Sequence, residues 1–215
     1  MLAFDTSAGH VAACLLAGDT ILDDIAEPMT RGQAERLVPA LEEMLERAGL
    51  DWGALDAIGT GIGPGNFTGI RISVSAARGL ALGLGIPAVG VSSFDALALD
   101  GPRPMIAAVG ASREGAFHQR FDPDGPGAPG LTQADGALSG CQVLARDMAD
   151  DPAGPCPILG HDLPGADAPA QSLARGIARI AASRLTGAPL PRPAPLYIRP
   201  ADAAPARDLP PVLLD

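Results

Sequence analysis

Two short stretches of the chain contain residue types that could contact a phosphate. Asp5, Thr6 and Ser7 offer a carboxylate and two hydroxyls at the end of a short apolar run, which suits a metal-bound phosphate. A second run has three glycines within seven residues, so it permits a tight turn. Its residues of interest are Gly63, Pro64, Gly65, Asn66, Phe67, Thr68, Gly69 and Arg71. Such a turn can cradle an anion or let another chain approach closely.

Each stretch also has a simpler structural explanation. Asp-Thr-Ser is too short to be diagnostic, and a turn at the end of a strand accounts for it. Glycine-rich turns are most often plain connections between a strand and a helix. The hydroxyl of Thr68 could cap a helix that begins here, and Asn66 could cap it as well. Phosphate contact, partner contact and simple packing all remain open at this point.

The common catalytic patterns have no match in the sequence. His10, His118 and His161 lack the HxxxH or HExxH spacing that places two ligands on adjacent helical turns. No serine lies in a GxSxG elbow, and there is no lysine for a Schiff base or a P-loop. The three cysteines lack a CxxC spacing. We therefore expect no catalytic residue and no metal site.

The composition indicates a globular protein that does not bind nucleic acid by itself. Of 215 residues, 47% are hydrophobic and 19% are charged, which permits a sizeable core. The formal net charge of −10 opposes phosphate binding, so any RNA role needs a partner. No apolar run is long enough to cross a bilayer, and the first residues lack the basic region of a secretory signal. We expect a cytoplasmic protein without membrane contact.

The strands that would position these motifs follow from the hydrophobic pattern. Apolar runs at Leu2–Asp5, Val11–Leu16 and Thr20–Ala26 are separated by turn-forming residues and predict three antiparallel strands. A fourth strand at Ala57–Gly61 should lead into the glycine run, and a fifth is expected at Ala88–Val91.

Three helices are expected between and after these strands. The first covers Thr30–Ala48, where Thr30 and Gln33 have the spacing of a capping box. The second covers Phe67–Leu84. The third follows Ser92, whose hydroxyl can cap it. The resulting order, βββαβαβα, is a ribonuclease-H-like pattern and predicts a mixed sheet with helices on its faces.

A break at Asp100–Pro104 divides the chain into two predicted units, residues 1–100 and a smaller α/β unit at 101–215. The elements expected in the second unit are strands at Met105–Gly110, Ala116–Phe121, Gln142–Ala145 and Pro157–Leu159, a helix at Gln171–Leu185 and a proline-rich tail.

Several motifs together resemble the TsaB family. They are Asp5-Thr6-Ser7, the Gln-Ala-Glu-Arg-Leu-Val-Pro run at Gln33–Pro39, the glycine run Gly63–Arg71, Gly90–Phe94 and Leu196–Arg199. The resemblance is strong over about residues 1–100 and patchy beyond Pro104. TsaB proteins are bacterial partners of TsaD in making threonylcarbamoyladenosine next to the tRNA anticodon.

The resemblance implies an actin-like ATPase fold: an α/β protein of two ribonuclease-H-like halves with mixed sheets flanked by helices, the second half reduced. It also implies a non-catalytic subunit, because TsaD supplies the chemistry. The implied partners are TsaD as a heterodimer, the TsaE ATPase, and a second copy of the chain when TsaD is absent. It implies tRNA contact only through the complex, and no cofactor beyond weak nucleotide binding at the complex interface. Asp5, Thr6 and Ser7 would then be a vestigial phosphate site.

In this family the two helices around the glycine run dock against a partner. Here they correspond to about Arg31–Ala48 and Phe67–Leu84, and the glycine run would position the second of them. Their apolar stripes are the candidate contacts. These residues are Leu37, Leu41, Met44, Leu45, Ile70, Val74, Ala77 and Ala81.

The chain departs from the family pattern in places. Gly110-Ala111-Ser112 stands where Asp-Ala-Arg is usual, and Asn66 replaces a usual serine but can still cap a helix. The alternative function is an enzyme of the same superfamily, either an ATP-dependent phosphotransferase that uses Asp5 or a glycoprotease-like hydrolase. The sequence offers neither a catalytic base nor metal ligands for such an enzyme.

Overall fold

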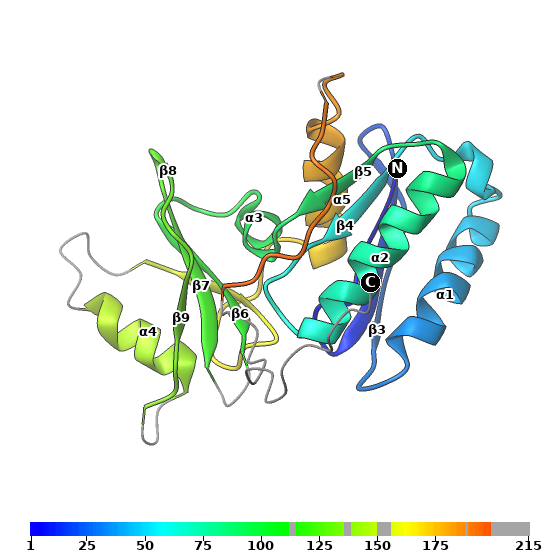
Figure 1. Ribbon diagram of the computed structural model, residues 1–215. Helices are drawn as coiled ribbons and strands as arrows, with labels where there is room; N and C mark the ends of the chain where they lie inside the picture. Colours follow the sequence, from blue (N-terminus) through cyan, green and yellow to red (C-terminus); the bar gives the residue numbers. More distant parts are fainter. Residues whose placement is uncertain (112–114, 136–138, 150–155, 188, 199–215) are drawn as a thin grey trace, which may run out of the picture.

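The computed structural model describes residues 1–111, 115–135, 139–149, 156–187 and 189–198, which form two sheets flanked by helices (Figure 1). The first sheet has the strand order β3-β2-β1-β4-β5. Its strands are β1 (Leu2–Asp5), β2 (His10–Ala17), β3 (Thr20–Pro28), β4 (Ile58–Gly61) and β5 (Ala88–Val91). β2 is antiparallel to β1 and β3, whereas β1, β4 and β5 run parallel. This is the mixed sheet that the βββαβαβα order predicts.

Helices cover both faces of the first sheet. They are α1 (Gln33–Arg47), α2 (Phe67–Leu84) and α5 (Leu173–Ser183). α1 and α2 lie side by side on one face, where Leu2 and Phe4 of β1 join their apolar cluster (Figure 1). α5 covers the other face, where Ala3 packs in a cluster with Ile177. Because successive strand residues point to opposite faces, β1 is buried on both sides.

The second sheet is smaller and has the order β10-β6-β7-β8, with β9 also paired to β7. Its strands are β6 (Met105–Gly110), β7 (Ala116–Asp122), β8 (Gly125–Pro126), β9 (Gly130–Thr132) and β10 (Ile158–His161). α4 (Gly140–Ala149) packs on it through Cys141 and Leu144, which contact the apolar cluster of Ile106 and Ala108. α3 (Ser93–Ala98) contacts both α5 and β6, so it joins the two sheets. A short 3₁₀ turn, η1 (Trp52–Ala54), precedes β4.

Most predicted elements are confirmed, and those of α2, β5 and β6 have the predicted bounds. The strand predicted at Gln142–Ala145 is wrong, because these residues lie inside α4. A short apolar run does not distinguish a strand from a buried helix by itself. The end of the Leu196–Arg199 motif and the tail beyond it lie outside the described residues. No described helix combines the length and apolar composition needed to span a bilayer.

The structure decides the capping predictions at the starts of α1 and α2, and only the Asn66 cap of α2 is confirmed. The capping box of Thr30 and Gln33 is wrong: α1 follows Gly32 in the left-handed region at φ 87°, and the Gln33 side chain donates to the Met29 carbonyl at 3.2 Å. At α2 the side chain of Asn66, rather than that of Thr68, is the cap. It accepts hydrogen bonds from the amides of residues 68 and 69.

α5 follows the predicted boundary at residue 100 in sequence but packs on the first sheet. Arg175 donates to Asp24 of β3 at 2.8 Å, and Arg184 donates to the Gly90 carbonyl of β5 at 2.8 Å. These two arginines therefore hold α5 to that sheet. The division into units 1–100 and 101–215 stays a prediction.

Two glycines of α2 provide a matched test of its packing. A Cβ at Gly69 would overlap the Thr6 carbonyl oxygen, whereas a Cβ at Gly79 would meet no atom within 4 Å. We expect Gly69→Ala to lower the free energy of unfolding by about 2 kcal/mol or more, because overpacking forces the backbone apart. Gly79→Ala should raise it by about 0.5–1 kcal/mol, because alanine favours a helix. Urea unfolding followed by circular dichroism measures both changes, and equal destabilisation would contradict the close contact at Gly69.

Candidate functional site

The candidate site lies where the carboxyl ends of β1 and β4 meet the start of α2. Asp5 ends β1 and is fully buried. Its Oδ1 accepts hydrogen bonds from the Ser7 amide at 2.9 Å and the Ser7 hydroxyl at 2.8 Å, and lies 2.9 Å from His10 Nε2. A Cβ at Gly61, the last residue of β4, would overlap Asp5 Oδ2. Glycine at that position is therefore what leaves room for the carboxylate.

The surroundings of Asp5 favour its ionised form. Burial raises the pKa of Asp5, but the hydrogen bond and charge of His10 and the hydrogen bonds of Ser7 outweigh burial, so the pKa falls below its usual value. Oδ2 is buried and has no hydrogen-bond partner among the described residues. The His10 tautomer that donates through Nε2 to this carboxylate has its lone pair on Nδ1.

The hydroxyls of Thr6 and Ser7 are already used within the protein. Thr6 Oγ1 donates to the Gly69 carbonyl at 2.7 Å, and Ser7 Oγ donates to Asp5. Each hydroxyl has one proton to donate. Ser7 is bonded to the carboxylate and not to His10, so the order of groups differs from the Ser-His-Asp triad of hydrolases. A phosphate at this strand end would have to displace these bonds, and the vestigial phosphate site stays a prediction.

The glycine run lies directly on the backbone that follows β1. The Asn66 amide donates to the Ser7 carbonyl at 2.6 Å, and a Cβ at Gly65 would overlap the same oxygen. Gly63 has φ 90°, and its carbonyl accepts from the Ser93 amide of α3 at 2.8 Å. The close approach that the glycines permit is therefore, in this chain, an approach between two of its own segments.

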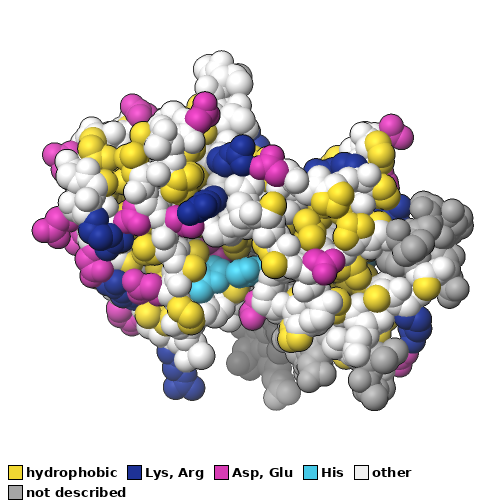
Figure 2. Space-filling model, turned by 180° about the vertical axis from the view of Figure 1, so that it is seen from behind, with side chains coloured by type: hydrophobic (Ala, Val, Ile, Leu, Met, Phe, Trp, Pro, Cys, Tyr) yellow, Lys and Arg dark blue, Asp and Glu magenta, His cyan; other side chains and the backbone are white. Residues whose placement is uncertain are grey.

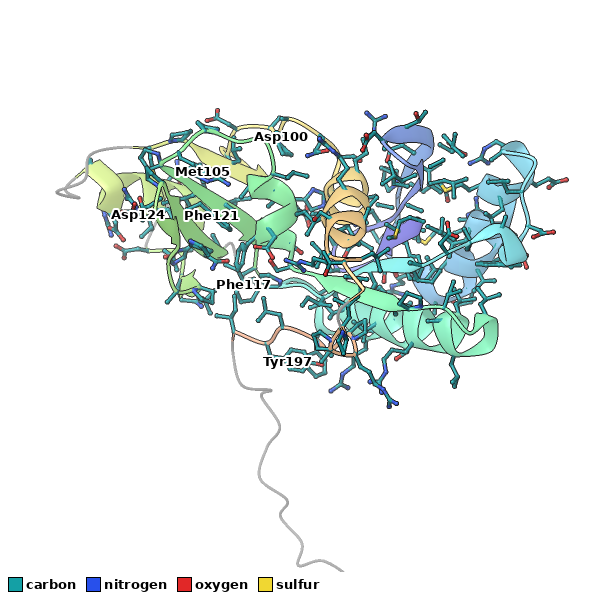
Figure 3. All side chains as sticks on the ribbon, turned by 90° about the horizontal axis from the view of Figure 1, so that it is seen from above. Asp100, Met105, Phe117, Phe121, Asp124 and Tyr197 are labelled. Atoms are coloured by element: carbon teal, nitrogen blue, oxygen red, sulfur yellow. The ribbon has the colours of Figure 1, made fainter. Side chains whose placement is uncertain are left out.

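An aromatic and arginine cluster lies at the N-terminal end of α2. The Phe67 and Tyr197 rings have centroids 5.0 Å apart, and the Arg71 guanidinium carbon lies 3.8 Å from the Phe67 centroid. Arg71 Nε donates to the Tyr197 hydroxyl at 3.1 Å. Figure 3 shows Tyr197 on the C-terminal segment. The amide of the preceding residue, Leu196, donates to the Ile62 carbonyl at 2.8 Å. Two motifs far apart in sequence are thus neighbours.

The eight apolar residues predicted as partner contacts are core residues of this chain. None is more than 7% exposed. They are Leu37, Leu41, Met44 and Leu45 on α1 and Ile70, Val74, Ala77 and Ala81 on α2. Amphipathic helices bury their apolar stripe against their own sheet, and these helices do so here. A partner can reach α1 and α2 only through their outward faces, where Val38 is 39% and Leu82 is 85% exposed.

His161, at the end of β10, adds a group from the second sheet. Its Nε2 lies 3.2 Å from His10 Nδ1, and the two ring centroids are 4.9 Å apart. Nothing in the sequence connects the two histidines, because 151 positions separate them and neither belongs to a motif with metal-ligand spacing. Among the described residues, no three His, Cys, Asp or Glu side chains are grouped so that they could hold a metal ion.

Comparisons of sequence match about half of the chain to known proteins. The family model of TsaD, tRNA N6-adenosine threonylcarbamoyltransferase, matches residues 25–119. The tRNA threonylcarbamoyladenosine biosynthesis protein TsaB of Haemophilus influenzae is 35% identical over 100 residues, which are 46% of this chain and 41% of that protein. TsaB of Escherichia coli is 30% identical over 129 residues, 58% of this chain and 55% of that protein. The chain thus spans about half the length of these curated relatives.

A solved structure extends the likeness in fold. A Pseudomonas aeruginosa protein, described as similar to the peptidase YeaZ, superposes with a TM-score of 0.67 at 24% identity and covers 92% of this chain and 98% of that one. At this identity the likeness concerns the fold alone, and it confirms the α/β fold with two ribonuclease-H-like halves. By sequence over about half of its length, the chain therefore resembles the TsaB family, as its motifs predicted.

Proposed function

We propose that this chain is a non-catalytic subunit of the complex that makes threonylcarbamoyladenosine in tRNA, where it binds and supports TsaD and enables TsaE to associate. The observation that carries the proposal is the similarity to TsaB, together with the match of the TsaD family model over residues 25–119, which contain α1 and α2. In this proposal the protein acts in the cytoplasm, pairs with a second copy of itself when TsaD is absent, and reaches tRNA only through the complex. The net charge of −10 supports the last point.

The first sheet supports a role without catalysis. The hydroxyls of Thr6 and Ser7 donate hydrogen bonds to groups within the chain, and Asp5 is fully buried by its neighbours. The amides of Thr68 and Gly69 at the start of α2 are taken by the Asn66 side chain. These are the donors that a phosphate would need. Any nucleotide would bind weakly, at the interface of the complex.

The docking surface in this proposal is the outward face of α1 and α2. Its residues are Ala34 and Val38 on α1 and Arg71, Ser75, Gly79 and Leu82 on α2, all of them exposed. The α2 residues recur every three or four positions and so form one stripe. Leu82 is 85% exposed. It lies one turn of helix after Gly79, where an added Cβ would meet no other atom within 4 Å. A partner helix could approach closely at the glycine and bury the leucine.

Gly79→Arg tests this surface without disturbing the fold. A Cβ at this position meets no atom within 4 Å, and arginine has a higher helix propensity than glycine, so the thermal stability should not fall. The same side chain would fill the gap that a partner needs, so we expect at least a tenfold weaker complex with a coexpressed TsaD homologue. Size-exclusion chromatography and a titration measure the complex.

The matched control for Gly79→Arg is Ser183→Arg, which adds the same side chain at an exposed position of α5, on the other side of the sheet. It should leave the complex intact. If the unaltered chain and TsaD elute separately at micromolar concentration, the proposed function is wrong. If Gly79→Arg binds normally, the function survives but the docking surface is elsewhere.

The alternative enzyme function predicts turnover by the chain alone. We expect isothermal titration of the isolated protein with ATP and Mg²⁺ to show at most weak binding, and no release of phosphate, because Thr6 and Ser7 are engaged within the chain. Asp5→Asn should leave this background unchanged. Tight binding with hydrolysis that Asp5→Asn abolishes would instead favour the phosphotransferase.

A further inference from the structure

His10 and His161 bring two imidazole nitrogens together from different sheets. His10 begins β2 of the first sheet, and His161 ends β10 of the second. Figure 2 shows histidine side chains at the surface near the centre of the molecule's rear face. His10 is mostly buried and His161 is partly exposed, so the pair can be reached from solvent.

The separation of the two nitrogens fits a shared metal ion. His10 Nδ1 and His161 Nε2 are 3.2 Å apart. Two nitrogens that each lie about 2.0–2.1 Å from a tetrahedral Zn²⁺ are about 3.3 Å apart. The same separation fits a hydrogen bond from His161 Nε2 to His10 Nδ1 in the metal-free protein. Binding of an ion would replace this bond and shift the His161 proton to its other nitrogen.

Asp5 prepares His10 for this role. A histidine that binds a metal commonly donates its other N–H to a carboxylate, which fixes the tautomer and raises the basicity of the ligand. His10 Nε2 lies 2.9 Å from Asp5 Oδ1, so the tautomer that donates to Asp5 has its lone pair on Nδ1, the nitrogen that faces His161. One buried residue thus fixes the orientation of the ligand and places a negative charge behind it.

The charges around His161 also favour a cation. Burial lowers the pKa of His161, and His10 lowers it further, whereas Asp5 and Asp162 oppose this shift. The net result is a neutral imidazole at pH 7, as a metal ligand must be. Asp5 and Asp162 act in the direction that stabilises positive charge at the pair, and the charge that opposes them is that of His10 itself.

We propose that His10 and His161 form a binding site for a divalent transition-metal ion such as Zn²⁺, with Asp5 as the positioning residue for His10. The chain supplies two ligands, and water completes the coordination. The ion would join the first sheet to the second at this point. The site is independent of the proposed role in tRNA modification, because none of its residues belongs to the outward face of α1 and α2.

The test is a titration of the full chain with Zn²⁺ after removal of metal by a chelator, at pH 7.5. We expect one Zn²⁺ per chain, and at least tenfold weaker binding for His161→Ala. Asp5→Asn should weaken binding by roughly 10–100-fold through His10. His118→Ala is the matched control and should bind as the unaltered chain does. Circular dichroism without metal shows whether each variant is folded.

Two further measurements make the outcome decisive. The Co²⁺ form should show d–d bands without a sulfur-to-metal band, which separates the histidine pair from the three cysteines. Binding should be lost as the pH falls through the pKa of His161, below its usual value of 6.5, because protons compete for the lone pair. Equal affinity of His161→Ala and the unaltered chain, or a sulfur-to-metal band, would overturn the proposal.

Discussion

The contact between the glycine run and the backbone after β1 is the constraint on which the first half of the structure depends. Gly65 and Gly69 lie so close to the carbonyls of Ser7 and Thr6 that a single Cβ at either position would overlap an oxygen. The Thr6 hydroxyl and the Asn66 amide close this contact with two hydrogen bonds. Because α2 begins here, the contact sets the position of the whole helix, and the outward face of α2 is presented at a defined place.

A buried carboxylate organises the other side of the same strand end. Burying a charge is costly unless it is hydrogen-bonded, and Asp5 meets this condition through Ser7 and His10. His10 in turn contacts His161 of the second sheet, so the charge is linked to the junction of the two halves. α3 and α5 strengthen the junction, because α3 contacts β6 as well as α5. The polar groups at this strand end thus hold the structure together, which is why few remain for binding a phosphate.

The same arrangement decides which surfaces of the first half remain open to contact. In an α/β sheet, ligands bind beyond the carboxyl ends of the strands, and that region of the first sheet is filled here by side chains of the chain itself. What the first half leaves exposed is a helical surface with a protruding Leu82 and a thin Gly79. An exposed apolar side chain beside open space on a helix is typical of a surface that contacts another protein.

The sequence by itself determined the local elements, because hydrophobic periodicity, glycines and the Asn66 cap act over a few residues, and its motifs showed the resemblance to the TsaB family. It predicted α2, β5 and β6 to the residue and the order of the first sheet. It could not decide whether the short run at Gln142–Ala145 is strand or helix, since that depends on what the run packs against. Nor could it show that the apolar stripes of α1 and α2 are consumed by their own sheet, or that His161 meets His10. Only the tertiary structure decides these points, because burial and contacts between residues 151 positions apart arise when the sheets pack together.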